Sequence, residues 1–458
     1  MYQINFSHPV SVHFIGIGGI SMSGLAAILL KEGFQVSGSD AKESDLTRWL
    51  ESKGARIVYG QSASNIHSSL DVVVYTAAIH PDNPEFAAAK EAGIPMLTRA
   101  ELLGEIMQNY STSIAVSGTH GKTTTTSMLS HIMLAANMDP TISVGGILKA
   151  IHGNIRVGNS QNFITEACEY TNSFLSLSPK IGLILNIDAD HLDFFKDLED
   201  IRHSFAAFAK KLPSDGVLII NSAIPRLKEI TDGLSCRVIT YGKEDSDYCP
   251  ANVTYNELGF GSFDLMRGKT CLGHFDLMVP GEHNVSNAVA SLAAADLLQA
   301  DYPSMYQGLL SFTGTDRRFE RKGQFNGITV IDDYAHHPTE IRATLSAARH
   351  YPHNTIWCVF QPHTYTRTKA LLDEFAQALT LADQVVLADI YAARETDTLG
   401  ISSRTLLEKV QALGANARYF PSFDEIETFL LQHCAPGDLL ITMGAGDVVK
   451  IGEHLLGQ

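Results

Sequence analysis

The sequence predicts an α/β protein with three domains, and its length and its order of elements both support this class. A chain of 458 residues suits two to four domains of roughly 150 residues each. Short apolar runs alternate with helical stretches at both ends of the chain, as in the βαβ units of a parallel sheet. We expect a Rossmann-like N-terminal domain at 1–109, a central P-loop ATPase-type α/β domain with a small antiparallel part at 110–316, and a Rossmann-like C-terminal domain at 317–458.

The first hundred residues alternate strand and helix patterns. Strands are expected at Ser11–Ile17, Phe34–Gly38 and Asp71–Thr76, and helices at Ile20–Glu32 and Leu46–Lys53. The last of these strands is almost continuously apolar, as a parallel strand buried on both faces should be. These elements predict a doubly wound sheet.

The central and C-terminal parts show the same rhythm with one interruption. Central strands are expected at Ser113–Val116, Asn162–Glu166, Ile181–Ile187 and Gly216–Ile220, with helices from Lys122 and at Ala288–Gln299. Residues 237–280 alternate in polarity and are rich in turn residues, which predicts an antiparallel ribbon. The C-terminal strands are expected at Ile328–Asp332, Thr355–Val359, Gln384–Leu387 and Asp438–Met443.

The composition excludes several classes of partner and compartment. The formal net charge is −16, which argues against nucleic-acid and membrane-surface binding, because such polymers and lipids repel an acidic surface. The N-terminus lacks a basic region before an apolar core, and no apolar run is long enough to cross a bilayer. The six cysteines are scattered without a C-x-x-C pair, which indicates reduced thiols rather than a metal cage. We expect a cytoplasmic protein.

The strongest motif is Gly118-Thr119-His120-Gly121-Lys122-Thr123-Thr124, directly after a predicted strand and at the start of a predicted helix. Backbone N–H groups in such a turn can hold phosphate oxygens. Lys122 would add a point charge, and the Thr123 hydroxyl could bind Mg²⁺. Alone, the motif could be a glycine turn with an incidental lysine. The strand–loop–helix setting favours nucleotide binding.

A second glycine-rich turn, Gly16-Ile17-Gly18-Gly19, also follows a strand and opens a helix. Asp40 follows the second strand, where dinucleotide-binding domains keep a ribose-binding acid. A nicotinamide site is therefore the main rival interpretation. Two different nucleotides, ATP on one domain and a nucleotide-linked substrate on another, would account for both turns.

Acidic and histidine residues follow several predicted strands. Because the carboxyl ends of parallel strands meet at one edge, these side chains should face a shared crevice. For Glu166 and His191 we favour Mg²⁺ binding, whereas Asp188 and Asp193 could equally cap a solvated turn. His336 and His337 precede a proline and could bind a ligand or cap a helix. Elsewhere, Arg367 could clamp a substrate carboxylate or lie unpaired on the surface.

Seven segments in this order resemble the Mur ligases: GTHGKTTTT, EACE, NIDADHLD, GEHNVSNAVA, DRRFE, DDYAHHPTEI and QPHTYTRT. The segments GIGGISMSG and VSGSD resemble the N-terminal UDP-sugar domain of the alanine-adding branch. The resemblance covers essentially the whole chain. It implies an ATP-dependent ligase, with Mg²⁺, that joins L-alanine to the muramoyl carboxylate of UDP-N-acetylmuramate through an acyl phosphate in peptidoglycan precursor synthesis. A monomer or weak homodimer is expected.

The resemblance also implies a role for each matching residue. Catalytic roles fall to Lys122, His191, Glu166 and His120, of which His120 should approach the muramoyl carboxylate. ATP is expected on Gly118, Thr119, His120, Gly121, Lys122, Thr123, Thr124, His283, Asn284, Asn287, Arg318, Asp333, Tyr334 and His336. Metal ligands would be Thr123, Glu166 and His191. The UDP-sugar is expected on Gly16, Gly18, Gly19, Asp40 and Arg99, and the amino acid on His363 and Arg367.

Two departures separate this chain from parts of the family. Several members carry a carbamylated lysine about fifteen residues after the magnesium histidine, but this stretch reads Ser204–Ala207 here, as in the alanine-adding branch. Some alanine-adding members have arginine where this chain has Thr364. The peptide-joining relatives share the N-terminal and central segments, and the QPHTYTRT segment favours alanine over a tripeptide. Folate-modifying relatives lack the N-terminal glycine turn.

Overall fold

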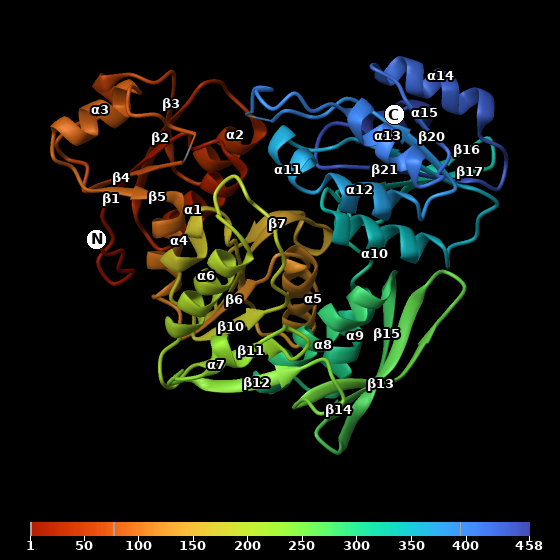
Figure 1. Ribbon diagram of the computed structural model, residues 1–458. Coiled ribbons are helices and arrows are strands. Elements are labelled where there is room, and N and C mark those ends of the chain that lie inside the picture. Colours follow the sequence, from red (N-terminus) through yellow and green to blue (C-terminus); the bar gives the residue numbers. More distant parts are fainter. Residues whose placement is uncertain (1, 77, 394) are drawn as a thin grey trace.

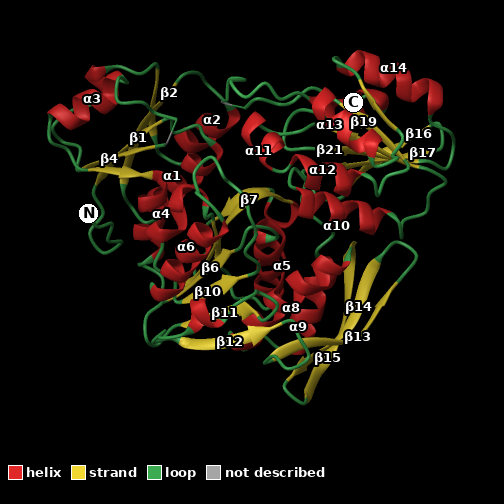
Figure 2. Ribbon diagram, viewed as in Figure 1, coloured by secondary structure: helices red, strands yellow, loops and turns green. Residues whose placement is uncertain are grey.

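The computed structural model describes residues 2–76, 78–393 and 395–458. Within these residues the chain forms three sheets flanked by helices, one five-stranded, one ten-stranded and one six-stranded (Figures 1 and 2). The N-terminal and C-terminal units both adjoin the central part of the molecule (Figure 1). The predicted α/β class with three parallel-sheet units is confirmed.

The N-terminal sheet has the strand order β3-β2-β1-β4-β5, and its strands are all parallel. Its strands are β1 (Ser11–Ile15), β2 (Gln35–Asp40), β3 (Arg56–Tyr59), β4 (Val72–Tyr75) and β5 (Met96–Thr98). Its helices are α1 (Ile20–Lys31), α2 (Asp45–Ser52), α3 (Pro84–Glu91) and α4 (Arg99–Met107). The strand order reverses between β1 and β4, which is where ligands bind in doubly wound sheets.

The central sheet has the order β15-β14-β13-β12-β11-β10-β6-β9-β7-β8. Its strands are β6 (Thr112–Ser117), β7 (Thr141–Leu148), β8 (Gly153–Arg156), β9 (Asn162–Ala167), β10 (Ile181–Ile184), β11 (Val217–Asn221), β12 (Arg237–Tyr241), β13 (Tyr248–Tyr255), β14 (Phe260–Arg267) and β15 (Thr270–Pro280). Its helices are α5 (Lys122–Ala135), α6 (Leu198–Lys210), α7 (Lys228–Thr231), α8 (Glu282–Leu297) and α9 (Tyr302–Ser311).

The prediction of an antiparallel ribbon for 237–280 is wrong for its first strand. β12 pairs in parallel with β11, and the antiparallel pairs are β13–β14 and β14–β15. The crossover between β11 and β12 holds α7, a four-residue helix that is too short to show helical periodicity in the sequence. The antiparallel hairpin β7–β8 at the opposite edge was not predicted.

The C-terminal sheet has the order β16-β17-β21-β18-β19-β20, with β16 antiparallel to the rest. Its strands are β16 (Glu320–Phe325), β17 (Ile328–Asp333), β18 (Ile356–Phe360), β19 (Gln384–Leu387), β20 (Ala417–Tyr419) and β21 (Leu439–Met443). Its helices are α10 (Pro338–Ala348), α11 (Tyr365–Ala370), α12 (Leu372–Leu379), α13 (Ser403–Ala412), α14 (Phe423–His433) and α15 (Val449–Leu455). No helix in the described part of the chain is long and apolar enough to cross a membrane.

The two outer domains attach to the centre in different ways. One apolar core is shared by the two domains, since it includes Val12 and Phe14 of the N-terminal sheet together with Phe205 and Phe208 of the central domain. The contact is close, because a methyl group on Gly24 in α1 would overlap the Ile155 side chain and one on Gly104 in α4 would lie 2.1 Å from a backbone oxygen. The apolar clusters of the C-terminal domain, in contrast, contain no central-domain residue among those described. Polar contacts therefore matter more at that second junction.

Candidate active site

A glycine-rich turn joins β6 to α5 at the carboxyl edge of the central sheet. Gly121 caps α5 in a left-handed conformation with φ 84°, and a methyl group there would lie 2.6 Å from the Asn287 side-chain oxygen. The turn is anchored to the loop after β10, since the His120 backbone N–H donates to Asn186 Oδ1 at 2.8 Å. The N–H groups that open α5 suit an anion such as a phosphate.

Lys122 begins α5 and folds back over this turn. Its ammonium donates to the carbonyl oxygens of Gly118 (2.5 Å) and Thr119 (3.0 Å) and to a Glu169 oxygen (2.9 Å). Burial disfavours the charge, but the Glu169 carboxylate outweighs burial, and the pKa of Lys122 is raised overall. The turn therefore carries a fixed positive charge that can neutralise phosphate oxygens.

The two carboxylates at the end of β9 point to different neighbours. Glu169 lies between Lys122 and His191, and its Oε1 is 3.6 Å from His191 Nε2. Glu166 instead accepts the Gly145 backbone N–H of β7 at 2.5 Å. His191 has φ 54°, an uncommon backbone conformation of the kind found at functional sites.

Thr123 lies near the same stretch of β7 as Glu166. A methyl group on Gly146 would meet Thr123 Cγ2 at 3.3 Å, and one on Gly145 would meet Glu166 Oε2 at 2.9 Å. The absence of side chains at these two glycines lets the Glu166 carboxylate and the Thr123 side chain pack directly against β7. Oxygen donors of this kind are the ligands that Mg²⁺ prefers.

A cavity of 290 Å³ opens beside the turn, between the central domain and α10. Its wall includes the predicted ATP-binding residues His120, Gly121, Thr124, His283, Asn284, Asn287, Arg318 and Asp333, but not Gly118, Thr119, Lys122, Thr123, Tyr334 or His336. Phe312 and Thr315 also line it. The Thr315 hydroxyl is buried and has no hydrogen-bond partner among the described residues. A partly apolar cavity with an unpaired polar atom suits a ligand with a flat ring and polar edges.

Burial shifts the pKa values of two titratable groups in the cavity wall toward their neutral forms. Burial lowers the pKa of His283 to about 4 and raises the pKa of Asp333 to about 6. Asp333 accepts the backbone N–H groups of Phe319 (2.8 Å) and Ala335 (2.7 Å). Asp333 therefore also fixes the backbone where the C-terminal domain begins.

Glu340, in the first turn of α10, connects the C-terminal domain to the glycine turn. Its Oε1 lies 3.4 Å from His120 Nδ1 and 3.6 Å from Arg318 Nη1, and its Oε2 accepts the His336 backbone N–H at 3.1 Å. Burial opposes the charge of His120, but Asp188 and Glu340 together raise the pKa of His120 to about 9. A cation thus lies between two carboxylates at the domain junction.

Aromatic and imidazole rings form a row at this edge of the C-terminal sheet. The Tyr334 ring lies 5.3 Å from the Arg318 guanidinium and 5.4 Å from the His336 ring. His336 in turn lies 5.7 Å from His363. Burial lowers the pKa of both histidines to about 4, so both rings are neutral at pH 7.

Arg367 lies in α11 and faces the central domain. Its Nε donates to Asp190 Oδ1 at 2.9 Å, and its Nη1 lies 3.1 Å from His363 Nδ1. A small cavity of 70 Å³ is lined by Asp190, His191, Leu192, Asp193, Thr364, Thr366, Arg367, Ala370 and Leu371. Thr364, just before α11, has φ 66°, which is an outlier for a β-branched residue.

The N-terminal turn lies after β1, where the strand order of its sheet reverses. Gly16 has φ 81°, and its N–H donates to Ser39 O at 2.9 Å. The Gly18 N–H donates to Asp40 Oδ2 at 2.8 Å, and Gly19 caps α1. Arg99 begins α4, and burial lowers its pKa while the nearby Cys168 partly offsets this effect. Arg99 thus lies close to the end of β9.

Several residues at the site were not among the predicted site residues. Glu169 and Glu340 occur in quoted segments, but sequence alone does not show which carboxylate faces the turn. Asp190 lies in the segment NIDADHLD, and no role was predicted for it. In the structure its carboxylate pairs with Arg367. Thr315 carried no signal in the sequence.

Family models match most of the chain in three parts. They are the "Mur ligase family, catalytic domain" at residues 11–111, the "Mur ligase middle domain" at 116–295 and the "Mur ligase, glutamate ligase domain" at 317–446. The chain belongs to the Mur ligase family. As expected for this family, it is ATP-dependent.

Several relatives with high sequence identity are UDP-N-acetylmuramate–L-alanine ligases. The UDP-N-acetylmuramate–L-alanine ligases of Agathobacter rectalis and Lachnospira eligens are 62% and 60% identical to this chain, over 100% of both sequences in each case. The crystal structure of the UDP-N-acetylmuramate–alanine ligase from Thermotoga maritima is 30% identical, with a TM-score of 0.78 over 98% of each chain. A murein peptide ligase from Psychrobacter arcticus is 25% identical, with a TM-score of 0.70 over 98% of each chain.

Proposed function

We propose that this Mur ligase joins L-alanine to the carboxylate of UDP-N-acetylmuramate and cleaves ATP to ADP and phosphate in the process. The reaction belongs to peptidoglycan precursor synthesis in the cytoplasm. Relatives that share more than half of its residues over their full length carry this activity in their names. The single structural observation that supports it best is the fixed Lys122 ammonium beside a turn that opens into the 290 Å³ cavity.

The proposed ATP site combines the turn and the cavity. The phosphates would lie on the N–H groups of the turn and on the Lys122 ammonium, because both favour negative charge. The adenine ring would enter the cavity beside His283, Asn284 and Asn287, where apolar walls and the unpaired Thr315 hydroxyl suit its faces and edges.

Mg²⁺ fits the residues beside β7. Thr123 and Glu166 would offer a hydroxyl and a carboxylate, and both side chains pack against Gly145 and Gly146. His191, beside Glu169, would complete the proposed ligand set. When bound, the ion would neutralise charge on the transferring phosphoryl group.

The other two substrates would lie on either side of the phosphates. The N-terminal turn, with Asp40 and Arg99, would hold the uridylyl part of the substrate. Arg367 would receive the alanine carboxylate, and Asp190 beside it could hold the ammonium group. The 70 Å³ cavity around this pair is small, which favours a single small amino acid over a tripeptide.

The chemistry then follows in two steps. A muramoyl carboxylate oxygen attacks the γ-phosphorus, the bond to the bridging oxygen breaks, and ADP leaves. The neutral alanine amine attacks the acyl carbon of this acyl phosphate. The bond from that carbon to the phosphate oxygen breaks, and inorganic phosphate leaves with the proton that the amine loses. His120 would help to orient the carboxylate, and contact between α10 and the turn would exclude water from the acyl phosphate.

A phosphate-release assay tests this function. It would contain UDP-N-acetylmuramate, ATP and Mg²⁺ with alanine, serine, glycine, glutamate or the muropeptide tripeptide. We expect release with alanine at the highest kcat/KM. Preference for the tripeptide would indicate a peptide-joining ligase, and binding of the UDP-sugar without release under any acceptor would indicate a sensor. NADH binding without phosphate release would indicate a dehydrogenase.

We also propose that the enzyme works as a monomer or weak homodimer. Sedimentation velocity at micromolar concentration would test this state directly, and a stable higher oligomer would exclude it.

A further inference from the structure

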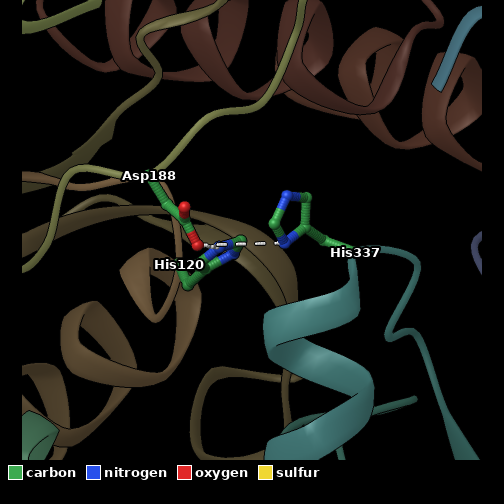
Figure 3. Close-up of side chains that lie close together, drawn as sticks. All are labelled: His120, Asp188 and His337. Carbon is green, nitrogen blue, oxygen red and sulfur yellow. Dashed lines mark hydrogen bonds and ion pairs between the residues drawn. The ribbon is translucent and has the colours of Figure 1, made fainter. Parts of the chain in front are cut away.

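The loop after β10 in the central domain binds the first turn of α10 in the C-terminal domain. Asp188 Oδ2 accepts the Thr339 hydroxyl at 2.6 Å, and the Ala189 carbonyl accepts a hydrogen bond from His337 Nε2 at 2.9 Å. His337 Nδ1 accepts the Thr339 N–H at 3.2 Å, so the proton of this imidazole lies on Nε2. Figure 3 shows His337, at the start of α10, facing Asp188 and His120.

The next residue of the same loop also binds the C-terminal domain. Asp190 Oδ1 accepts Arg367 Nε–H at 2.9 Å and the His191 backbone N–H at 2.7 Å. This carboxylate therefore helps to hold His191 at its unusual φ of 54°. Residues 188–190, which we call the docking segment, thus each bind a different side chain of the C-terminal domain.

The docking segment also touches the glycine turn. Asp188 Oδ2, which accepts the Thr339 hydroxyl, lies 3.4 Å from His120 Nε2, and Glu340 Oε1 lies 3.4 Å from His120 Nδ1. The apolar clusters of the C-terminal domain include no described residue of the central domain. Polar contacts of this kind therefore hold the junction and fix the side chains on either side of it.

We propose that Thr339 and His337 are positioning residues, which use the docking segment to couple attachment of the C-terminal domain to the placement of His120 and His191. This inference rests on the proposed function, which assigns the muramoyl carboxylate to His120 and Mg²⁺ to His191. A loosened junction would admit water to the acyl phosphate. Water adds to the acyl carbon, the bond from that carbon to the phosphate oxygen breaks, and the carboxylate, inorganic phosphate and one proton are released without product.

The docking test uses the full chain without substrates. Hydrogen–deuterium exchange would be measured over residues 186–195 in the wild type, Thr339→Val and Thr339→Ser. The Ala189 N–H donates to Asp188 Oδ1 at 2.9 Å, so its exchange reports how firmly that carboxylate is held. Valine keeps the branched shape of threonine without the hydroxyl, whereas serine keeps the hydroxyl. We expect about tenfold faster exchange in Thr339→Val, because a lost hydrogen bond to a charged group shifts an equilibrium by about that factor, and wild-type exchange in Thr339→Ser.

Two further variants sharpen this test. In His337→Asn the side chain can still accept the Thr339 N–H and cap α10, but it is too short to reach the Ala189 carbonyl, so exchange should again be faster. The matched control is Thr405→Val. Thr405 lies in the first turn of α13, and its hydroxyl has no hydrogen-bond partner within the described part of the chain. This control should change neither exchange nor turnover.

The activity test compares the phosphate released with the alanine adduct formed from UDP-N-acetylmuramate, ATP and alanine. Both amounts should be equal in the wild type and Thr339→Ser. In Thr339→Val we expect kcat for the adduct to fall about tenfold, phosphate to exceed the adduct, and KM for the UDP-sugar to stay nearly unchanged. A general loss of stability would not alter the ratio of phosphate to adduct, because unfolded molecules make neither.

Three results would overturn the proposal. They are wild-type exchange in Thr339→Val, equally fast exchange in Thr339→Val and Thr339→Ser, and faster exchange in Thr339→Val with phosphate and adduct still equal and kcat unchanged. If the wild type released no phosphate with any acceptor, the proposed function would fail, while the exchange experiment would still test the docking segment.

Discussion

The two glycine-rich turns of this chain, after β1 and after β6, share a backbone plan and differ in the charge beside them. Each follows a buried parallel strand and opens a helix, so each can offer N–H groups to an anion. The turn after β6 holds the Lys122 ammonium against its own carbonyls. The turn after β1 has no lysine between residues 16 and 30, and the Asp40 carboxylate accepts its Gly18 N–H.

The difference teaches which turn can do chemistry. A cation beside the N–H groups can neutralise charge that develops during phosphoryl transfer. A carboxylate at the same place uses one N–H group, repels a phosphate close to it and can accept hydrogen bonds from hydroxyl groups. We infer that the turn after β6 supports the reaction and that the turn after β1 only holds a substrate.

The largest effect should come from Lys122→Ala. This change removes the fixed cation at the turn, and we expect kcat for phosphate release to fall by at least about 10²–10³-fold, as when one transition-state hydrogen-bond donor is lost. Binding of the UDP-sugar, measured by calorimetry without ATP, should change little. If turnover persisted, phosphoryl transfer would not take place at the turn after β6, and the inferred difference between the two turns would be wrong.

Adding one methyl group to each turn should affect KM for different substrates. In Gly18→Ala the new methyl group lies 2.8 Å from Asp40 Oδ2 and 2.9 Å from Thr47 Cγ2, and in Gly121→Ala it lies 2.6 Å from Asn287 Oδ1 at a positive φ. Crowding of this size costs about 1–3 kcal/mol. A cost of about 1.4 kcal/mol in this range weakens binding about tenfold.

Gly18→Ala should therefore raise KM for the UDP-sugar about tenfold and leave KM for ATP nearly unchanged, with the reverse for Gly121→Ala. Initial-rate measurements with each substrate varied in turn would separate the two. Equal effects on both KM values would show that the turns do not serve separate ligands.

The sequence predicted the features that depend on neighbours along the chain. The helix that starts at Lys122 was predicted correctly, because a strand, a glycine turn and a helix follow one another within about twenty residues. A role was predicted for Glu166 alone, and the contact of Glu169 with Lys122 was missed. The chain after β9 turns sharply, with φ 55° at Thr171 and 58° at Asn172, and sequence spacing does not show such a turn. Glu340 reaches His120 only because two domains meet, and that approach depends on contacts distant in sequence.

Local pattern also explains what was missed in the fold. β7 contains Gly145 and Gly146, which weaken any strand pattern, and its partner β8 has only four residues. The same two glycines allow the close approach of Glu166 and Thr123, because a methyl group on either glycine would crowd one of these side chains. A weak strand signal here accompanies a functional requirement, as expected where a sequence departs from local rules.

Asp40→Asn should have a smaller effect than either methyl substitution. The amide oxygen can still accept the Gly18 N–H, so the turn keeps its shape, but the charge is lost. A charged hydrogen bond is worth about 1.5–3 kcal/mol against about 0.5–1.5 for a neutral one. We expect about a fivefold rise in the Kd of the UDP-sugar if Asp40 binds a substrate hydroxyl group. Tighter binding would instead show that the carboxylate repels the ligand, and titration calorimetry distinguishes the two.

The smallest effect should be a pH dependence of the protein's stability. It should come from the turn after β6, because only that turn of the two contains a histidine. The pKa of His120 is raised to about 9 in the folded protein, against about 6.5 in an unfolded chain. Its stabilising contribution is therefore complete below pH 6.5 and is lost as pH rises through about 9. Glu340→Gln removes one of the two carboxylates responsible, so the thermal unfolding midpoint should fall less between pH 6.5 and 9 than in the wild type, by a difference of up to about 3 °C. Parallel pH curves for the two proteins would mean that Glu340 does not stabilise the protonated imidazole, and that Asp188 alone raises the pKa of His120.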